Sequence, residues 1–180
     1  MKILETKIED LLVLEPEVFT DDRGFFLESF NQKKFNDATG REIKFVQDNH
    51  SFSKKDTLRG IHYQLNPNAQ GKLVRVVSGE VLDVAVDLRT ESKTFGEWCG
   101  VILNEYNNKQ FWVPEGFGHG FVVLSDSAHF LYKTTAFYSK ESERSIIWND
   151  SDLNINWGVK DPLLSKKDLE SPKFNNSDYF

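Results

Sequence analysis

The sequence predicts an all-β protein with a single domain, and three observations support this prediction. Hydrophobic side chains recur at every second position of short segments, most clearly between Leu82 and Leu88, and this period of two is typical of a half-buried strand. Turns containing Gly, Pro and Asn separate the segments, and the 15 Phe and 4 Trp residues favour strands over long helices. A chain of 180 residues can enclose one core, so we expect a sandwich or barrel of short strands.

The predicted elements follow one another in a simple order. Ser29-Phe30-Asn31-Gln32 matches a capping box before a short helix that Gly40 can end. Strands begin at about residue 44, and Ser78-Gly79-Glu80 is expected to join the strands 73–77 and 82–88 as a hairpin. Further strands are expected over 110–113, 120–124 and 128–138. The residues from about 150 to 180 lose the alternation and are expected to pack as loops and short helices against the barrel.

Composition and charge narrow the classes of function. The net charge is -6, which does not favour extended binding to nucleic acid, although a few arginines can bind the phosphates of a small molecule. Cys99 is the only cysteine, so no disulfide can form within the chain, and no segment resembles a secretory signal or a membrane span. We therefore expect a cytoplasmic protein that binds neither membranes nor nucleic acid.

The segment 58–64, followed eight residues later by Lys72, is the strongest candidate for a site. A lone histidine is most often structural, but Arg59 and Lys72 near His62 would be costly to bury without a ligand. A regular strand sends Arg59 and His62 to opposite faces, because they are three residues apart. Gly60 permits a bulge that could bring both side chains to one site.

Two tyrosines form a second candidate. Tyr132 and Tyr138 are six residues apart on a predicted strand, so both would lie on one face, while Lys133 would point away. They could simply fill the interior of a barrel. Alternatively, one phenol could donate a proton while the other presents an aromatic surface to a ring. The residues alone leave both interpretations open.

His119 and Asp168 also allow two interpretations each. The segment Pro114–Phe121 has three glycines around His119, which fits either a tight turn with an exposed histidine or a backbone that approaches a ligand closely. Asp168 ends Ser165-Lys166-Lys167-Asp168, a variant of the capping box that favours a helix start. The functional alternative is a carboxylate that orients His62 and stabilises its protonated form.

The sequence does not favour a metal or a cofactor. Pro114-x-Gly116-x-x-His119 resembles the second metal motif of the cupin superfamily, but the first motif would supply His-x-His and a downstream Glu. The corresponding stretch here is His62-Tyr63-Gln64, which leaves two strong ligands where catalytic metal sites use three. The chain also shows no glycine-rich loop for a dinucleotide. We therefore predict a site without metal or cofactor.

Taken together, the motifs closely resemble those of the dTDP-4-dehydrorhamnose 3,5-epimerase family, a metal-independent branch of the cupins. The resemblance extends in family order over nearly the whole chain. The matching segments are Asp22–Phe26, Gln47–Ser51, Leu58–Gln64, Gln70–Val74, Asp83–Arg89, Thr94–Gly96, Pro114–Phe121, Tyr132-Lys133 and Leu164–Asp168.

This resemblance implies a cupin-type jelly-roll barrel over residues 1–180 with short peripheral helices. It also implies a homodimer, in which N-terminal strands and a short helix within about residues 1–45 contribute to the dimer and to the neighbour's site. Residues 150–180 would pack on the barrel. By family role, His62 is the expected base with Asp168 as its partner, Tyr132 the acid, and Lys72 the group that stabilises an enolate oxygen.

The implied substrate is a dTDP-4-keto-6-deoxy sugar, inverted at C3 and C5 in dTDP-L-rhamnose biosynthesis. The alternatives are a mono-epimerase on a related nucleotide sugar, or a sugar-nucleotide binding module without catalysis. Small departures from the family pattern occur at Gly118, Ser139-Lys140 and Trp157-Gly158. The expected substrate contacts are Arg23, Phe26, Glu28, Gln47, Asp48, Asn49, Arg59, His119, Tyr138, Glu143 and Lys167, with Phe26 and Tyr138 near the nucleotide.

Overall fold

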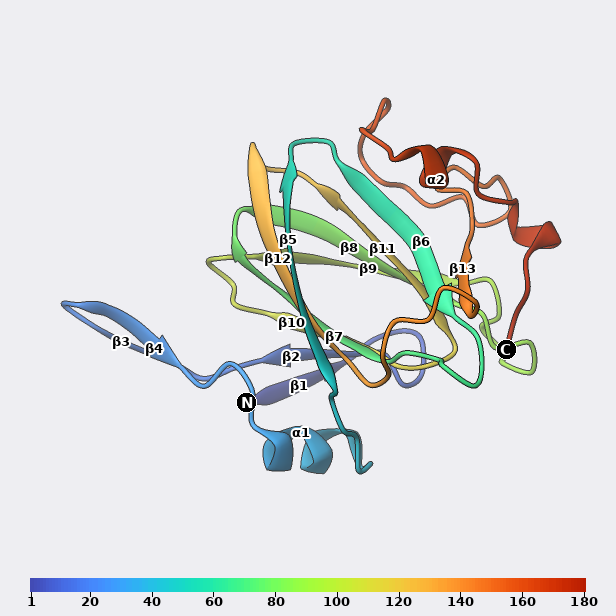
Figure 1. The fold of residues 1–180 in the computed structure, drawn as a ribbon. Helices are drawn as coiled ribbons and strands as arrows, with labels where there is room; N and C mark the ends of the chain where they lie inside the picture. Colours follow the sequence, from blue (N-terminus) through green and yellow to red (C-terminus); the bar gives the residue numbers. More distant parts are fainter.

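Two facing antiparallel sheets form the body of the protein (Figure 1) in a computed structural model that describes residues 1–180. The six-stranded sheet has the order β1-β2-β10-β7-β12-β5, with strands Lys2–Glu5, Leu12–Glu15, Gln110–Val113, Lys72–Ser78, Ser127–Thr134 and Gln47–Lys54. The five-stranded sheet has the order β13-β6-β11-β8-β9, with strands Glu143–Ser145, Leu58–Gln64, Phe117–Val123, Glu80–Asp87 and Trp98–Asn104. The predicted all-β class is confirmed.

The main core lies between the two sheets. It gathers apolar side chains from β7, β10, β11 and β12, and the rings of Phe121 and Phe130 stack at 4.2 Å across the interior. A second buried cluster covers the outer face of the five-stranded sheet, where Val84 and Val86 meet Trp157 and Phe174 from the C-terminal segment. That segment contains only the short helices α2 (Lys166–Leu169) and η1 (Phe174–Asn176). Its packing against the barrel is therefore as expected.

Helix α1 (Gln32–Thr39) packs against the outer face of the six-stranded sheet through buried Phe35. Its N-cap is Asn31, which accepts a hydrogen bond from the backbone of Lys34 at 3.1 Å, so the helix begins later than a cap at Ser29 would place it. Gly40 ends it in the left-handed conformation, as predicted. Neither this helix nor any other is long and apolar enough to cross a membrane.

The predicted hairpin of β7 and β8 is wrong, because the two strands belong to different sheets. The chain turns sharply at Gly79, whose φ of 82° suits glycine. The Gly79 amide donates to the Glu105 side chain at 2.9 Å, and the Glu80 amide donates to the Ser125 hydroxyl at 2.8 Å. Side chains from two other loops thus accept hydrogen bonds from the backbone amides of this turn, at the point where the chain crosses from one sheet to the other.

Two predicted strand boundaries also need correction. The strand expected over 128–138 ends at Thr134, because both neighbouring strands end there: Thr134 lies opposite Gln47 of β5 and Lys72 of β7. The strand expected to begin at residue 120 begins at Phe117. The predicted turn around His119 is therefore part of a strand.

A two-stranded hairpin, β3 (Val18–Asp21) with β4 (Gly24–Leu27), projects from the body, as the blue ribbon in Figure 1 shows. It pairs with neither sheet. Its aromatic side chains Phe19, Phe25 and Phe26 are all exposed. Monomeric proteins rarely leave so much apolar surface in one place.

Candidate active site

At Gly60, the alternation of inward- and outward-facing side chains along strand β6 shifts by one residue. Leu58, Ile61 and Tyr63 all join the outer cluster, which a regular strand would not allow for the first two. Gly60 has a φ of 141°, and the pairing of β6 with β11 shifts register beside it. The predicted bulge is confirmed.

The bulge turns Arg59 to the same side as His62. The Arg59 guanidinium reaches the hydroxyl of Ser53 on β5 at 3.0 Å, and Ser53 shares the inner face of that strand with Asn49. The room for this irregularity exists because Gly60 faces Gly120: a Cβ on Gly60 would lie 2.5 Å from the Gly120 Cα.

A cleft of about 200 Å³ opens into the barrel between the two sheets. Seven of the predicted site residues line it, and three further residues complete its wall. The lining consists of Gln47, Asn49, His62, Tyr63, Gln64, Gln70, Lys72, Tyr132, Tyr138 and Glu143. Seven of the expected residues therefore lie together in one cleft.

His62 is paired with Asp168 at the edge of this cleft. Its Nε2 lies 2.5 Å from Asp168 Oδ1, with 30% of the histidine side chain exposed but only 4% of the aspartate. Burial alone would raise the pKa of Asp168, but hydrogen bonds from His62 and Ser165 hold it below its usual value. The carboxylate therefore stays ionised and can stabilise a protonated imidazole.

The contacts that both interpretations of Asp168 require are present. Ser165 is the N-cap of α2: its hydroxyl accepts from the Asp168 amide at 3.1 Å and donates to Asp168 Oδ2 at 2.6 Å. The capping contact fixes the carboxylate, and the free oxygen meets His62. The N-cap of α2 thus positions the Asp168 carboxylate for His62 on strand β6.

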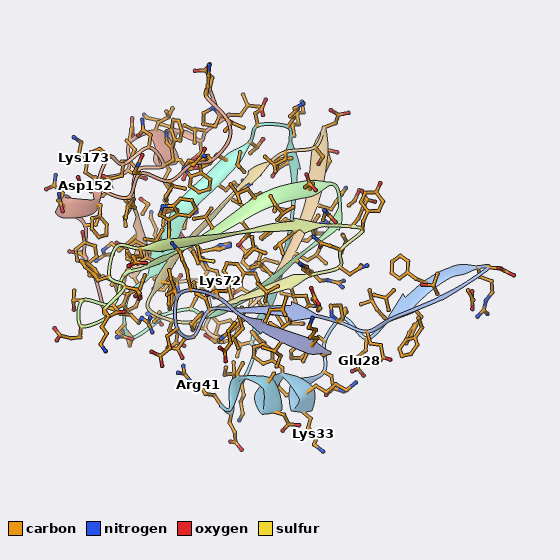
Figure 2. All side chains as sticks on the ribbon, turned by 180° about the vertical axis from the view of Figure 1, so that it is seen from behind. Glu28, Lys33, Arg41, Lys72, Asp152 and Lys173 are labelled. Carbon is orange, nitrogen blue, oxygen red and sulfur yellow. The ribbon has the colours of Figure 1, made fainter.

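Lys72 is buried between the sheets, and Figure 2 labels it within the body of the barrel. Burial lowers the pKa of its amine to about 8, while the charges of Asp83 and Glu143 act in the opposite direction. Its Nζ donates to the carbonyl oxygen of His62 at 3.3 Å. A cation therefore lies beside the histidine in a region of low dielectric constant, where its field acts strongly.

Tyr132 lies on the inner face of β12, opposite Asn49 of β5 and Val74 of β7. Burial raises the pKa of its phenol, although the charge of Arg59 opposes this effect. The phenol is therefore protonated at neutral pH and can act as a proton donor.

Tyr138 reaches the cleft from a loop, not from the strand that the sequence predicted. Its hydroxyl donates to Glu143 at 3.0 Å, and this bond raises the pKa of the tyrosine. Burial alone would raise the pKa of Glu143, but an ion pair with Lys167 at 2.5 Å keeps it below its usual value. The pair places Lys167 at the rim of the cleft.

Gln64 was missed as a site residue, and it explains how the Tyr138 loop is held. Its amide donates to the carbonyl of Asn68 at 2.6 Å and accepts from the Ser139 amide at 2.7 Å. The signal was available: Gln64 follows His62 by two residues on the same strand, so the two side chains share a face.

His119 is buried, so the interpretation as an exposed turn residue is wrong. It lies on β11 opposite His62 of β6, and its Nε2 is 2.9 and 3.0 Å from the two carboxylate oxygens of Asp83. Asp83 was also missed. It belongs to the strand predicted as half-buried, but every residue from Asp83 to Asp87 is buried, because the C-terminal segment covers the opposite face.

Four predicted contact residues lie away from the cleft in this chain. Asp48 points outward from β5 and pairs with Lys133 at 2.8 Å. Arg23, Phe26 and Glu28 belong to the projecting hairpin or its stem. Figure 2 shows Glu28 near the hairpin, well apart from Lys72 in that view. One chain alone does not bring these residues to His62.

The arrangement is that of an acid–base enzyme built into a two-sheet β-barrel, with a histidine–carboxylate pair and a protonated phenol in one cleft. No group of three or more His, Cys, Asp or Glu side chains is placed to hold a metal ion. The family model of dTDP-4-dehydrorhamnose 3,5-epimerase matches residues 5–176. The chain belongs to this family.

Individual relatives agree with this assignment. A dTDP-4-dehydrorhamnose 3,5-epimerase of Shigella flexneri is 61% identical over 100% of this chain and 99% of its own length. A crystal structure of the Legionella pneumophila dTDP-6-deoxy-D-glucose-3,5-epimerase, in complex with dTDP-4-keto-L-rhamnose, matches with a TM-score of 0.95 at 49% identity, covering 98% of this chain and 94% of that one. A dTDP-4-dehydrorhamnose 3-epimerase of Streptomyces niveus is 36% identical over 95% of this chain and 83% of its own.

Proposed function

We propose that this protein converts dTDP-4-dehydro-6-deoxy-D-glucose to dTDP-4-dehydro-L-rhamnose by inverting C3 and C5, as a step of dTDP-L-rhamnose biosynthesis. The observation that carries the proposal is the ion-paired His62, which lines one cleft together with the protonated phenol of Tyr132 and the buried ammonium of Lys72. A base and an acid in one cleft suit the removal of a proton from one face of a carbon and its return to the other.

The chemistry of the substrate fits these groups. C3 and C5 both flank the ketone at C4, so removing either proton gives an enolate. His62 takes the proton, and Asp168 stabilises the imidazolium that forms. The Lys72 ammonium stabilises the negative charge that develops on the C4 oxygen. Tyr132 then donates its proton to the opposite face of the carbon, which inverts it and leaves a tyrosinate opposite the imidazolium. Proton exchange with solvent returns both groups to their starting state, and no redox change occurs.

The other residues expected to contact the substrate suit its nucleoside diphosphate part. Arg59 bonds Ser53 and Lys167 pairs with Glu143, a residue that lines the cleft. A guanidinium can bind phosphate oxygens in pairs. The ring of Tyr138 is more than half exposed, so one face is available to stack on a base. Gln47 supports that loop by accepting from the Tyr138 amide at 3.3 Å.

The working form that we propose is a homodimer of single-domain chains in which the β3–β4 hairpin of one chain closes the cleft of its partner. Arg23, Phe26 and Glu28 would then reach the substrate from the second chain. The projecting hairpin with its exposed phenylalanines supports this arrangement. So does the outer face of the six-stranded sheet, where half-buried Arg75 forms no ion pair and Phe52 is exposed.

The cytoplasm is the proposed site of the reaction. The single Cys99 is free, and unpaired cysteines are typical of reducing compartments.

The proposal is tested by incubating the protein with dTDP-4-dehydro-6-deoxy-D-glucose in D₂O and following each sugar carbon by NMR. Deuterium at both C3 and C5 is expected. Label at C3 alone would favour the mono-epimerase alternative, which the similarity to a 3-epimerase supports. No label with folded, nucleotide-binding protein would contradict catalysis on this sugar and favour a binding module.

A further inference from the structure

The loop that carries Tyr138 has little packing of its own. It spans residues 135–142 between β12 and β13 and contains no helix or strand. At its middle, Phe137 and Tyr138 are 67% and 56% exposed. Because no core encloses these two rings, hydrogen bonds to the loop largely determine where the Tyr138 ring lies.

The side chain of Gln64 bonds the residues on both sides of Tyr138. Its Nε2 donates to the carbonyl oxygen of Phe137 at 3.2 Å, and its Oε1 accepts from the Ser139 amide at 2.7 Å. Nε2 also donates to the carbonyl oxygen of Asn68 at 2.6 Å, which fixes the orientation of the side-chain amide. This position therefore needs two donors and an acceptor together, which a glutamine amide supplies and a carboxylate or an apolar side chain does not.

Two other glutamines bond the same loop, but from more exposed positions. Gln70 donates to the carbonyl oxygen of Ala136 at 2.7 Å, and Gln47 accepts from the Tyr138 amide at 3.3 Å. Both glutamines are only partly buried, whereas Gln64 is 3% exposed. A hydrogen bond shielded from water is electrostatically stronger, so we expect Gln64 to contribute most to the position of the loop.

Gln64 also connects this loop to the strand that carries the proposed general base. It follows His62 by two residues on β6, so both side chains lie on one face of the same strand. We propose that Gln64 is a positioning residue for the nucleotide: it holds the backbone on both sides of Tyr138, so that the ring can stack on the nucleobase at a fixed distance from His62. This inference rests on the proposed function, from which it takes the stacking at Tyr138.

Loss of the Gln64 bonds should weaken nucleotide binding without slowing the chemistry. The methionine in Gln64→Met has a similar length but replaces none of the three hydrogen bonds. The Tyr138 ring then has to be ordered when the nucleotide binds, and immobilising one such side chain lowers the affinity by about two- to tenfold. His62 and Tyr132 keep their places, so kcat should change by less than about twofold while KM rises.

The experiment is a double-mutant cycle on the binding of dTDP, measured by titration calorimetry. It compares the unmodified protein, Gln64→Met, Tyr138→Ala and the double variant. If Gln64 acts through the Tyr138 ring, Gln64→Met weakens binding in the unmodified protein but hardly at all once the ring is gone. A purely structural role would weaken binding equally in both backgrounds.

Asp150→Asn is the matched control for disturbing a buried side chain that holds distant backbone. Asp150 is 4% exposed, and its carboxylate accepts from the backbone amides of Leu153 and Phe174. It does not line the cleft, so Asp150→Asn should leave the affinity for dTDP unchanged. Thermal unfolding and kcat in the D₂O exchange assay are measured for every variant.

A loss of affinity in Gln64→Met that disappears in the Tyr138→Ala background supports the proposal. An equal loss in both backgrounds overturns it, and so does an unchanged affinity, with or without a fall in kcat. If Gln64→Met does not fold, Gln64→Glu takes its place in the cycle, because a carboxylate can accept from Ser139 but lacks both donors. Failure of both variants to fold, while Asp150→Asn folds, assigns Gln64 a structural role and also overturns the proposal.

The proposed function is tested separately, because dTDP binding requires no turnover. Missing deuterium exchange by unmodified protein that binds dTDP contradicts the epimerisation alone. Normal exchange together with an uncoupled cycle contradicts the role of Gln64 alone. No binding of dTDP by the unmodified protein would overturn both.

Discussion

The barrel cleft and the β3–β4 hairpin form two contrasting halves of the expected site. In the cleft, His62, Lys72 and Tyr132 are held by strands, and their polar partners are in place within one chain. The hairpin pairs with neither sheet, and Arg23 at its tip pairs only with its neighbour Asp21. One half is therefore organised before substrate binds, whereas the other leaves its aromatic side chains exposed.

This difference assigns the proton transfers to the barrel and the closing of the cleft to the hairpin. Proton transfer demands fixed distances, which packed strands provide. Recognition of a long, flexible nucleotide sugar also needs a wall that excludes water, and a hairpin from a second chain can supply it. We therefore expect barrel variants to lose turnover, and hairpin variants to lose affinity and depend on the oligomer.

The largest effect is expected from His62→Asn. The substitution removes the base but leaves the strand and its bulge intact, so turnover should fall by about 10²–10⁴-fold or more. The measurement is deuterium exchange at C3 and C5, with circular dichroism as a check on folding. Asp161→Asn, at an exposed position of the C-terminal segment, is the control and should keep nearly full activity. Near-normal exchange by folded His62→Asn would contradict its role as base.

A complementation experiment tests whether the hairpin serves the partner's cleft. His62→Asn and the double variant Arg23→Ala/Phe26→Ala are each expected to be nearly inactive or weak. In a mixed dimer, the intact barrel of one chain meets the intact hairpin of the other. Random pairing of two-fold dimers should therefore leave about a quarter of all sites intact after co-expression, and about half of the sites in mixed dimers isolated with two affinity tags.

The control for this experiment mixes His62→Asn with Tyr132→Phe. Both substitutions lie in the barrel half, so no mixed dimer contains an intact site and activity should stay low. No recovery in the hairpin mixture would mean that each chain uses its own hairpin. Recovery in the control would mean that His62 and Tyr132 of one site come from different chains.

Substitutions at two glycines compare how strongly the barrel and the hairpin contribute to the free energy of unfolding. Gly60 and Gly24 both have φ values that disfavour other residues, 141° and 125°, but only Gly60 is crowded by backbone. Gly60→Ala adds a clash with Gly120 to the conformational strain and should destabilise the protein by about 3 kcal/mol or more. Gly24→Ala in the open hairpin turn should cost about 1 kcal/mol. Urea unfolding of both variants checks this order, and equal midpoints would contradict it.

Local sequence patterns predicted many of the barrel strands. They failed where contacts with distant parts of the chain determine the burial of a residue or the end of a strand. The alternation of apolar and polar residues predicted the strand around Asp83, and the glycine at position 60 predicted the bulge in β6. Alternation cannot tell what covers each face, so Asp83 was not recognised as a buried group. Tyr138 was misplaced because the end of β12 depends on where β5 and β7 end.

The contact of His62 with Asp168 shows the same limit. The two residues are 106 positions apart in the chain, and the sequence around Asp168 explains only a helix cap. Its role as the partner of His62 came from the family resemblance. Similarly, nothing local distinguishes a hairpin that packs on its own barrel from one that projects toward a second chain.

The smallest effect is expected at Tyr138, which lies between the two halves. Tyr138→Phe keeps the ring that would stack on the base and loses only an exposed hydrogen bond to Glu143, so KM should rise by less than about threefold. Tyr138→Ala removes the ring as well and should raise KM by about tenfold, since aromatic pairs contribute about 1 kcal/mol beyond buried area. In both variants kcat should change little, because the phenol that donates the proton is Tyr132. A large fall in kcat for Tyr138→Phe would instead make Tyr138 the acid and place the proton donor on the loop.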